Sequence, residues 1–162
     1  AAGAAGAAGT QVATTASAGG LAPGYVFPVE KLPRHIRPST PIPSDLKFDE
    51  STLAKGDPAR GQKAFISCIG CHYVNGNPMA IGKIGPNLTH IGSRHTLGAG
   101  LFPNDARHLA YWIKNTRKMK PGVVMPALGA GEYDPVTKTT VPKSGLSDQT
   151  IADIVAYLQA LK

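Results

Sequence analysis

The sequence predicts an all-α domain preceded by a long, proline-rich N-terminal extension without regular structure. Two observations support this fold class. From residue 57 onward, three segments begin at a capping residue, two of them carry apolar side chains at helical spacing, and loops separate the three. Before that point alanine and glycine dominate first, in a stretch that has little to bury, and prolines that disfavour helix follow. A length of 162 residues fits one domain plus an extension.

The extension divides into two parts. Residues 1–20 are almost wholly Ala, Gly, Thr and Ser and predict a tether, either a spacer from a membrane anchor or a disordered tail. Residues 21–55 predict an extended arm, because six prolines alternate with apolar side chains. The apolar side chains indicate that the arm lies on a surface, either its own domain or another subunit. The length of the arm favours another subunit.

The domain begins near residue 56 with a predicted helix over 57–67. Asp57 can cap this helix, and Pro58 suits its first turn. Gly61 weakens a helix by about 1 kcal/mol relative to alanine, a cost that a close helix crossing would justify. The alternative is that the glycine is simply tolerated.

The segment Cys68-Ile69-Gly70-Cys71-His72 follows this helix directly and has the spacing of a c-type haem attachment site. Each thiol can form a thioether with one haem vinyl group, and His72 then lies under the iron as the proximal ligand. The alternatives are a redox dithiol, a surface disulfide or half of a zinc site. A dithiol does not need His72, and the chain has no second cysteine pair for zinc. The sequence therefore predicts one covalent haem c.

Residues 73–92 are predicted to be loop, and Gly85-Pro86-Asn87-Leu88 is a turn signal within it. A metal-bound histidine usually donates its other ring nitrogen to a nearby acceptor. The carbonyl of Pro86 is a candidate for that acceptor.

Two further helices are predicted. One covers 104–115, is capped by Asn104 or Asp105, and carries Trp112 on its apolar face. Trp112 can donate its indole hydrogen to a haem propionate or act as core. The other begins after the capping residue Ser147 and has an apolar stripe at helical spacing. Between them, residues 129–145 form a polar insert, a short hairpin or an irregular loop.

Three methionines are candidates for the second iron ligand, because a thioether is a soft neutral ligand suited to haem iron. Met79 lies close after the attachment site, and the flanking lysines of Met119 indicate exposure. Met125 lies among valines and a proline, an apolar and stiff setting. Each of the three can also be ordinary core.

The formal net charge of +7 lies entirely in residues 51–162, which carry thirteen basic and six acidic side chains. This charge favours an acidic redox partner, and the absence of a basic face with interleaved aromatics argues against nucleic acid. The lysines expected around the haem edge are Lys83, Lys114, Lys118, Lys120 and Lys143.

The sequence contains no transmembrane segment. Haem attachment predicts export to the bacterial periplasm or the outer face of the membrane. The start at Ala1 is expected to result from processing. A lipid anchor just upstream of Ala1 is an alternative that the sequence leaves open.

With these parts placed, residues 57–162 resemble a class I c-type cytochrome, because helix, CIGCH, GPNL, middle helix, Met-Pro and final helix follow in that family's order. The resemblance implies that Cys68 and Cys71 hold the haem, that His72 and Met125 are the axial ligands, and that Pro86 orients His72. It also implies that the first and last helices cross near Tyr157.

Residues 85–125 resemble more narrowly the cytochrome c domain attached to some haem–copper oxidases, in which the segment of Arg94 approaches the haem edge. The arm resembles that of the monohaem subunit of alternative complex III. The polar insert departs from the oxidase-linked domains. The resemblance thus implies a single-electron carrier rather than an enzyme, within a membrane respiratory or photosynthetic complex. A free periplasmic carrier, a haem enzyme or sensor with a labile methionine, and a structural subunit with an idle haem are the alternatives.

Overall fold

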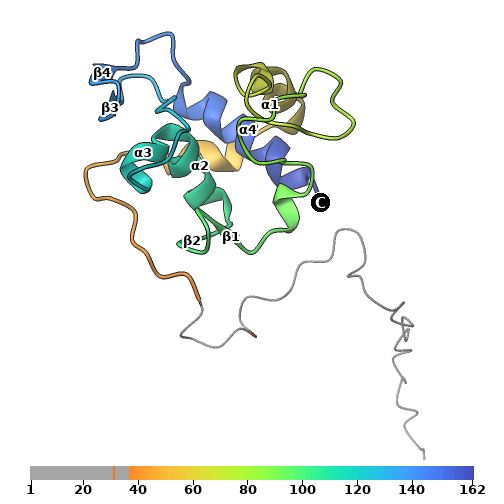
Figure 1. The fold of residues 1–162 in the computed structure, drawn as a ribbon, viewed down its shortest axis with the longest axis horizontal. Helices are drawn as coiled ribbons and strands as arrows, with labels where there is room; N and C mark the ends of the chain where they lie inside the picture. Colours follow the sequence, from red (N-terminus) through yellow and green to blue (C-terminus); the bar gives the residue numbers. More distant parts are fainter. Residues whose placement is uncertain (1–30, 32–36) are drawn as a thin grey trace, which may run out of the picture.

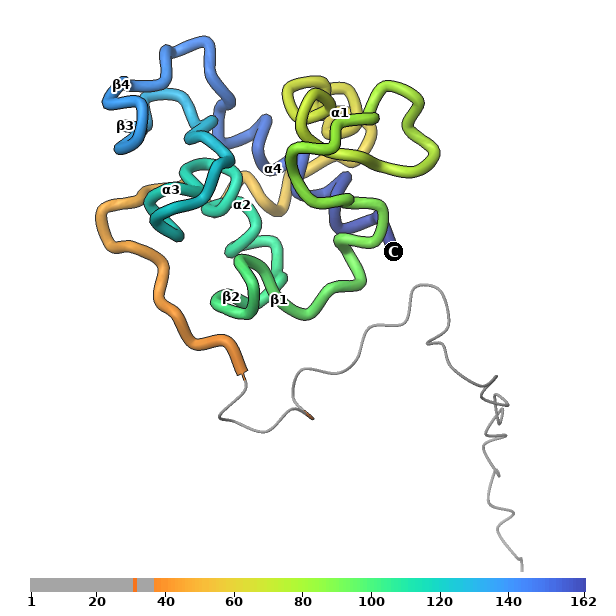
Figure 2. Tube along the Cα trace, in the orientation of Figure 1, coloured from red at the N-terminus to blue at the C-terminus, as the bar shows by residue number. Residues whose placement is uncertain are grey.

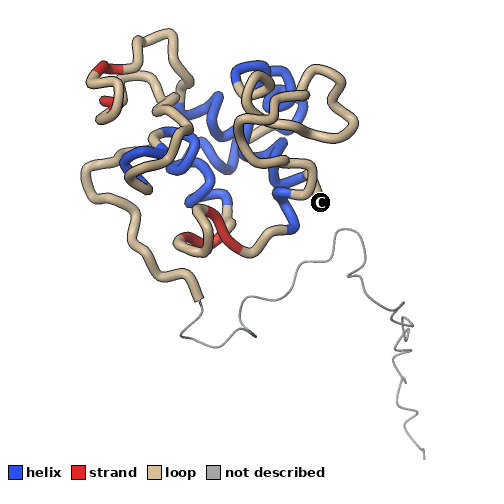
Figure 3. The backbone as a smooth tube through the Cα atoms, in the orientation of Figure 1, coloured by secondary structure: helices blue, strands red, loops and turns tan. Residues whose placement is uncertain are grey.

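The computed structural model describes residue 31 and residues 37–162, whose helices pack against one another around a shared core (Figure 1). Long loops connect the helices, and the strands are short pairs at two places on the surface (Figure 3). The helices are α1 (Pro58–Ala64), α2 (Ala106–Lys114), α3 (Thr116–Met119) and α4 (Asp148–Ala160). The shorter 3-10 segments are η3 (Glu50–Lys55), η4 (Phe65–Ser67) and η5 (Ile91–Ser93).

The predicted helix starts are confirmed. Asp57 accepts the backbone N–H of Arg60 at the start of α1, and Ser147 accepts that of Thr150 at the start of α4. Asp105, rather than Asn104, caps α2. The amide of Asn104 instead donates to two carbonyls of the preceding loop.

The first and last helices cross closely, as expected. A Cβ at Gly61 would lie 1.9 Å from the carbonyl oxygen of Asp153, so only glycine permits this approach. Next to the crossing, the rings of Phe65 and Tyr157 pack 5.4 Å apart. Gly61 is therefore required by packing, which accounts for its cost within a helix.

The insert at 129–145 contains a short hairpin. Strand β3 (Tyr133–Asp134) pairs antiparallel with β4 (Thr139–Thr140), and the buried Asp134 accepts the N–H groups of Val136 and Thr137 in the turn. A second pair, β1 (Thr96–Leu97) with β2 (Phe102–Pro103), precedes α2. Both pairs are too short to change the all-α class.

The described end of the arm corrects one expectation. Residues 37–49 run along the side of α3 and α2 (Figure 2), where Leu46 and Phe48 are buried in the core of the chain's own domain. The backbone N–H of Asp49 donates to the Asp148 carboxylate at 2.8 Å. For this part of the arm, the surface beneath it is not another subunit. The tether at 1–20 and the first part of the arm at 21–36, apart from residue 31, lie outside the described residues.

Within the part of the chain that the structure describes, no helix is both long and apolar enough to cross a membrane.

Candidate functional site

A cavity of about 610 Å³ lies between the attachment motif, α2, α4 and the loop before the hairpin. Its walls are mostly apolar, and Phe65, Leu109, Ile154 and Leu158 contribute to them from the surrounding helices. Cys68, Cys71, His72 and Met125 all line this one cavity. The structure thus brings together four residues that the sequence spreads over 58 positions.

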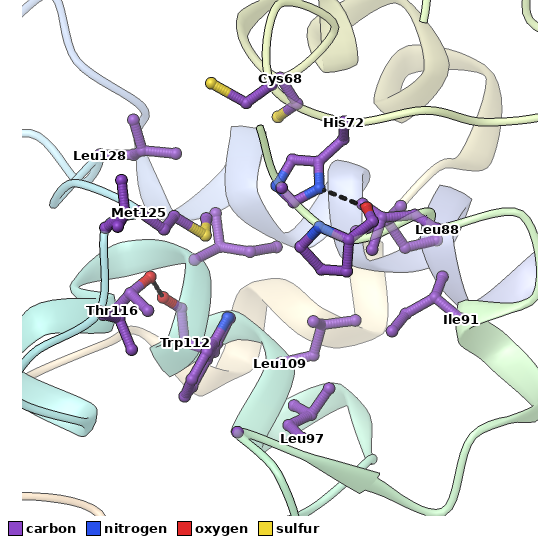
Figure 4. A pocket seen from close by; sticks show the side chains of 18 of the residues that line it. Cys68, His72, Leu88, Ile91, Leu97, Leu109, Trp112, Thr116, Met125 and Leu128 are labelled. Atoms are coloured by element: carbon purple, nitrogen blue, oxygen red, sulfur yellow. Dashed lines mark hydrogen bonds between the residues drawn. The ribbon is translucent and has the colours of Figure 1, made fainter. Parts of the chain in front are cut away.

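His72 is buried and held in one orientation. Its Nδ1 lies 2.9 Å from the carbonyl oxygen of Pro86, the acceptor expected from the turn signal. Because a carbonyl only accepts hydrogen bonds, Nδ1 carries the proton, and Nε2 keeps a free lone pair. The imidazole of His72 and the thioether of Met125 both extend into the cavity (Figure 4).

The other two methionines do not reach this cavity. Met79 is exposed on the surface. Met119 is buried at 5% exposure, so the expectation from its flanking lysines is wrong. The reason is α3, a single helical turn that places Met119 on the core side while Lys118 pairs with the carboxylates of Asp45 and Glu132.

The cysteines differ in exposure. Cys71 is exposed, whereas burial raises the pKa of the Cys68 thiol to about 12, and the neighbouring Cys71 adds to the shift. A redox dithiol needs a thiol whose pKa is lowered, so this environment argues against that alternative.

Arg94 and Trp112 also line the cavity. Arg94 is exposed, and its guanidinium donates to the carbonyl of Asn87 in the GPNL turn. Trp112 presents an edge of its indole to the cavity (Figure 4) and packs edge-on against Phe102. Their expected roles at the haem edge and at a propionate stay predictions.

Gly85 is missing from the predicted set of site residues, whereas Lys120 is one of the lysines expected around the haem edge. Gly85 lies against the His72 ring, where a Cβ would be 2.5 Å from Cε1. Lys120 lines the cavity and donates to the carbonyl of Gly98 at 2.9 Å. In the sequence, only the turn signal pointed to the segment of Gly85, and nothing in it indicated a contact with the His72 ring.

The residues present fit a haem c. The cavity offers an apolar enclosure, two thiols at its rim, an oriented imidazole and a thioether, and the cationic side chains Arg94 and Lys120. Pockets for organic cofactors are mostly apolar and carry a few polar or charged groups that fix the orientation of the ligand. The donor set, one imidazole and one thioether, is typical of electron-transfer haems.

Residues 58–162 match the cytochrome c family. Subunit 2 of cytochrome c oxidase from Alkalihalophilus pseudofirmus is 33% identical over 96 residues, covering 59% of this chain and 22% of that protein. Cytochrome c2 from Rhodoblastus acidophilus is 32% identical over 109 residues, covering 66% of this chain and 94% of that one. The solved structure of cytochrome c2 from Rhodobacter sphaeroides aligns with a TM-score of 0.42 at 22% identity, covering 65% and 95%. The chain thus spans about a fifth of the oxidase subunit and nearly all of these cytochrome c2 proteins.

Proposed function

This chain belongs to the cytochrome c family of electron carriers, which hold haem c covalently, and from that premise we propose that it works as a monohaem subunit of a membrane respiratory or photosynthetic complex. The observation that carries the electron-transfer role is the convergence of His72 and Met125 on one apolar cavity. Similarity to an oxidase subunit supports a place in such a complex. An assembly like alternative complex III or a terminal oxidase, on the outer face of the membrane, is the setting we propose.

In this proposal Cys68 and Cys71 would hold the haem through thioether bonds, and His72 and Met125 would bind its iron. When bound, the haem supplies one-electron chemistry by cycling between ferric and ferrous iron. Pro86 holds the proton of His72 at Nδ1, which keeps Nε2 directed into the cavity. The apolar side chains exclude water, which favours the reduced state.

If His72 and Met125 both bind the iron, small substrates would have no open site at the metal. The chain then passes electrons without catalysing a reaction of its own. A haem enzyme or gas sensor would instead need an exchangeable position. Carbon monoxide binding to the reduced protein separates the two, and rapid binding at neutral pH would contradict the carrier proposal.

We propose an acidic redox partner, although fewer lysines are available than expected. Lys114 is buried and pairs with Asp148, and Lys118 pairs with Asp45 and Glu132. Lys83 remains exposed, directly before the cavity residue Ile84. Electron transfer should slow as ionic strength rises, because salt screens charges beyond about 8 Å at physiological concentration.

A free periplasmic carrier is the second candidate, favoured by the nearly complete coverage of cytochrome c2 relatives. Isolation of the native protein tests the choice. Mild detergent extraction of membranes, followed by size-exclusion chromatography, should yield this chain together with other redox subunits. Recovery of the haem protein as a monomer in the soluble fraction would contradict the proposed complex and support the free carrier.

A further inference from the structure

Met125 lies in the stretch 120–132, which belongs to no helix or strand of the described chain. Its neighbours contribute little support: Val124 is 74% exposed, and Pro126 has no N–H group to donate. The thioether of Met125 can keep a fixed position on this irregular segment only if the neighbouring peptide groups form hydrogen bonds to a rigid element.

Arg117 and Asp134 supply these bonds. The guanidinium of Arg117, in α3, donates to the carbonyl of Val124 at 2.9 Å. Its other terminal nitrogen donates to both carboxylate oxygens of Asp134 at 2.7 Å. Asp134 also accepts the backbone N–H of Ala127 at 3.2 Å. The pair therefore bonds one peptide group just before Met125 and one just after Pro126.

The pair is itself rigidly held. The side chains of Arg117 and Asp134 are only 11% and 4% exposed, and the carboxylate also accepts two N–H groups of the hairpin turn. Asn115 ties the same hairpin to the end of α2 through the carbonyl of Tyr133 at 3.0 Å. Charge-assisted hydrogen bonds that are shielded from water are among the strongest in proteins.

We propose that Arg117 and Asp134 are positioning residues for Met125, forming a brace through which the 129–145 insert holds the distal ligand in place. The inference rests on the proposed role of Met125 as that ligand. It assigns a task to an insert for which the sequence pattern suggested none.

Competition by imidazole at the ferric holoprotein tests the brace. A methionine–iron bond adds a charge-transfer band at the red end of the visible spectrum, and imidazole removes the band as it displaces the thioether. Arg117→Lys keeps the charge but replaces the two nitrogens that bond Asp134 and Val124 by a single one on a shorter side chain. We expect it to lose one of these bonds and to bind imidazole about tenfold more tightly, the equivalent of one lost hydrogen bond. The double variant Arg117→Met/Asp134→Leu should do the same, and it leaves no unpaired buried charge that would prevent folding.

Glu132→Gln is the matched control. Glu132 lies in the same insert and accepts from Asn115, but it makes no bond to residues 124–127. Its imidazole affinity should equal that of the wild type.

Three results would overturn the inference. One is wild-type imidazole affinity in both brace variants, while Met125→Ala removes the band. Another is an equal gain in affinity in Glu132→Gln, which would indicate general loosening of the insert. The third is a band that is absent from the wild type or retained in Met125→Ala. That result alone would also refute the proposed ligand, so the two failures are distinguishable.

Discussion

The orientation of His72 depends on two adjacent residues in the GPNL turn. Pro86 contributes only its carbonyl oxygen, which accepts from Nδ1 at 2.9 Å. Gly85 contributes the absence of a side chain, since a Cβ there would lie 2.5 Å from Cε1 and 2.7 Å from Nδ1. The backbone N–H of Gly85 is bonded to the carbonyl of Cys71 at 2.7 Å, so the turn cannot move away freely.

Gly85→Ala should therefore displace the imidazole. We expect a loss of about 1–3 kcal/mol in the unfolding free energy of the haem-loaded protein, the usual cost of overpacking. A weaker bond from His72 should also enlarge the high-spin fraction of the ferric absorption spectrum. Urea unfolding and that spectrum are the measurements.

Pro86→Ala is the control, because the substituted residue keeps the accepting carbonyl. It should retain the wild-type spectrum. If Gly85→Ala and Pro86→Ala behave alike, loss of turn rigidity rather than contact with the imidazole explains the effect.

At the scale of single residues, the sequence could predict those whose functional groups belong to a recognisable local motif. Cys68, Cys71 and His72 form a spaced motif, and the carbonyl of Pro86 follows from a turn signal. Gly85 acts through a contact 13 positions away from its partner, which no local pattern encodes. Arg117 and Asp134 were missed for the same reason.

The crossing of α1 and α4 is the contact between elements that closes the domain, and both helices lie against each other in Figure 1. Gly61 permits the crossing, because its Cα approaches the backbone at Asp153. The sequence predicted both helices and noted the glycine. Only the three-dimensional contact shows that the glycine is required.

Gly61→Ala should destabilise the protein by about 2–3 kcal/mol, although alanine is the better helix former. The added methyl group cannot fit without separating the two helices. Urea unfolding followed by circular dichroism measures the change. Gly70→Ala is the control, because a Cβ at that position meets nothing within 4 Å, and it should change stability little.

The same crossing carries a buried acid. Asp153 accepts from Arg60 at 2.8 Å and from the backbone N–H of Asp57 at 2.9 Å. The hydrogen bond from Arg60 lowers the pKa of Asp153 below its ordinary value of 3.8, and although burial opposes the shift, the further donors add to it. A group whose pKa is lower in the folded state stabilises the fold above its unfolded pKa.

The contribution of Asp153 to the unfolding free energy should therefore be constant above about pH 4 and should fall as the pH drops below that value. Asp153→Asn should be less stable at neutral pH and show a shallower acid dependence. Unfolding midpoints measured along a pH series in urea test this. An unchanged acid slope in the variant would show that other carboxylates, such as Asp134, dominate the acid response.

For the molecule as a whole, the described end of the arm is part of the folded domain. Phe48 packs 5.7 Å from the ring of Tyr111 in α2, and Leu46 is 2% exposed. The η3 turn that follows contacts α4. The boundary that the sequence places at residue 55 marks a change in amino-acid composition. The hydrophobic core nevertheless includes residues on both sides of it.

Leu46→Ala should cost about 2–5 kcal/mol, as large-to-small changes in a core do. Lys47→Ala, one residue later, is exposed and donates only to the carbonyl of Ser44 within the arm. It should leave stability nearly unchanged. Equal, small effects of both substitutions in urea unfolding would mean that the arm is dispensable for the fold.

The sequence by itself determined the all-α class, the positions of the three longer helices, the caps Asp57 and Ser147, and the attachment motif, since each depends on residues within a few positions of one another. The tertiary structure alone decided where Leu46 and Phe48 are buried, why Gly61 and Gly85 lack side chains, and how the insert reaches Met125. These contacts join distant segments, as in the bond from Asp49 to Asp148 across 99 positions. Local spacing does not specify such contacts, because they follow from how the helices pack around the cavity.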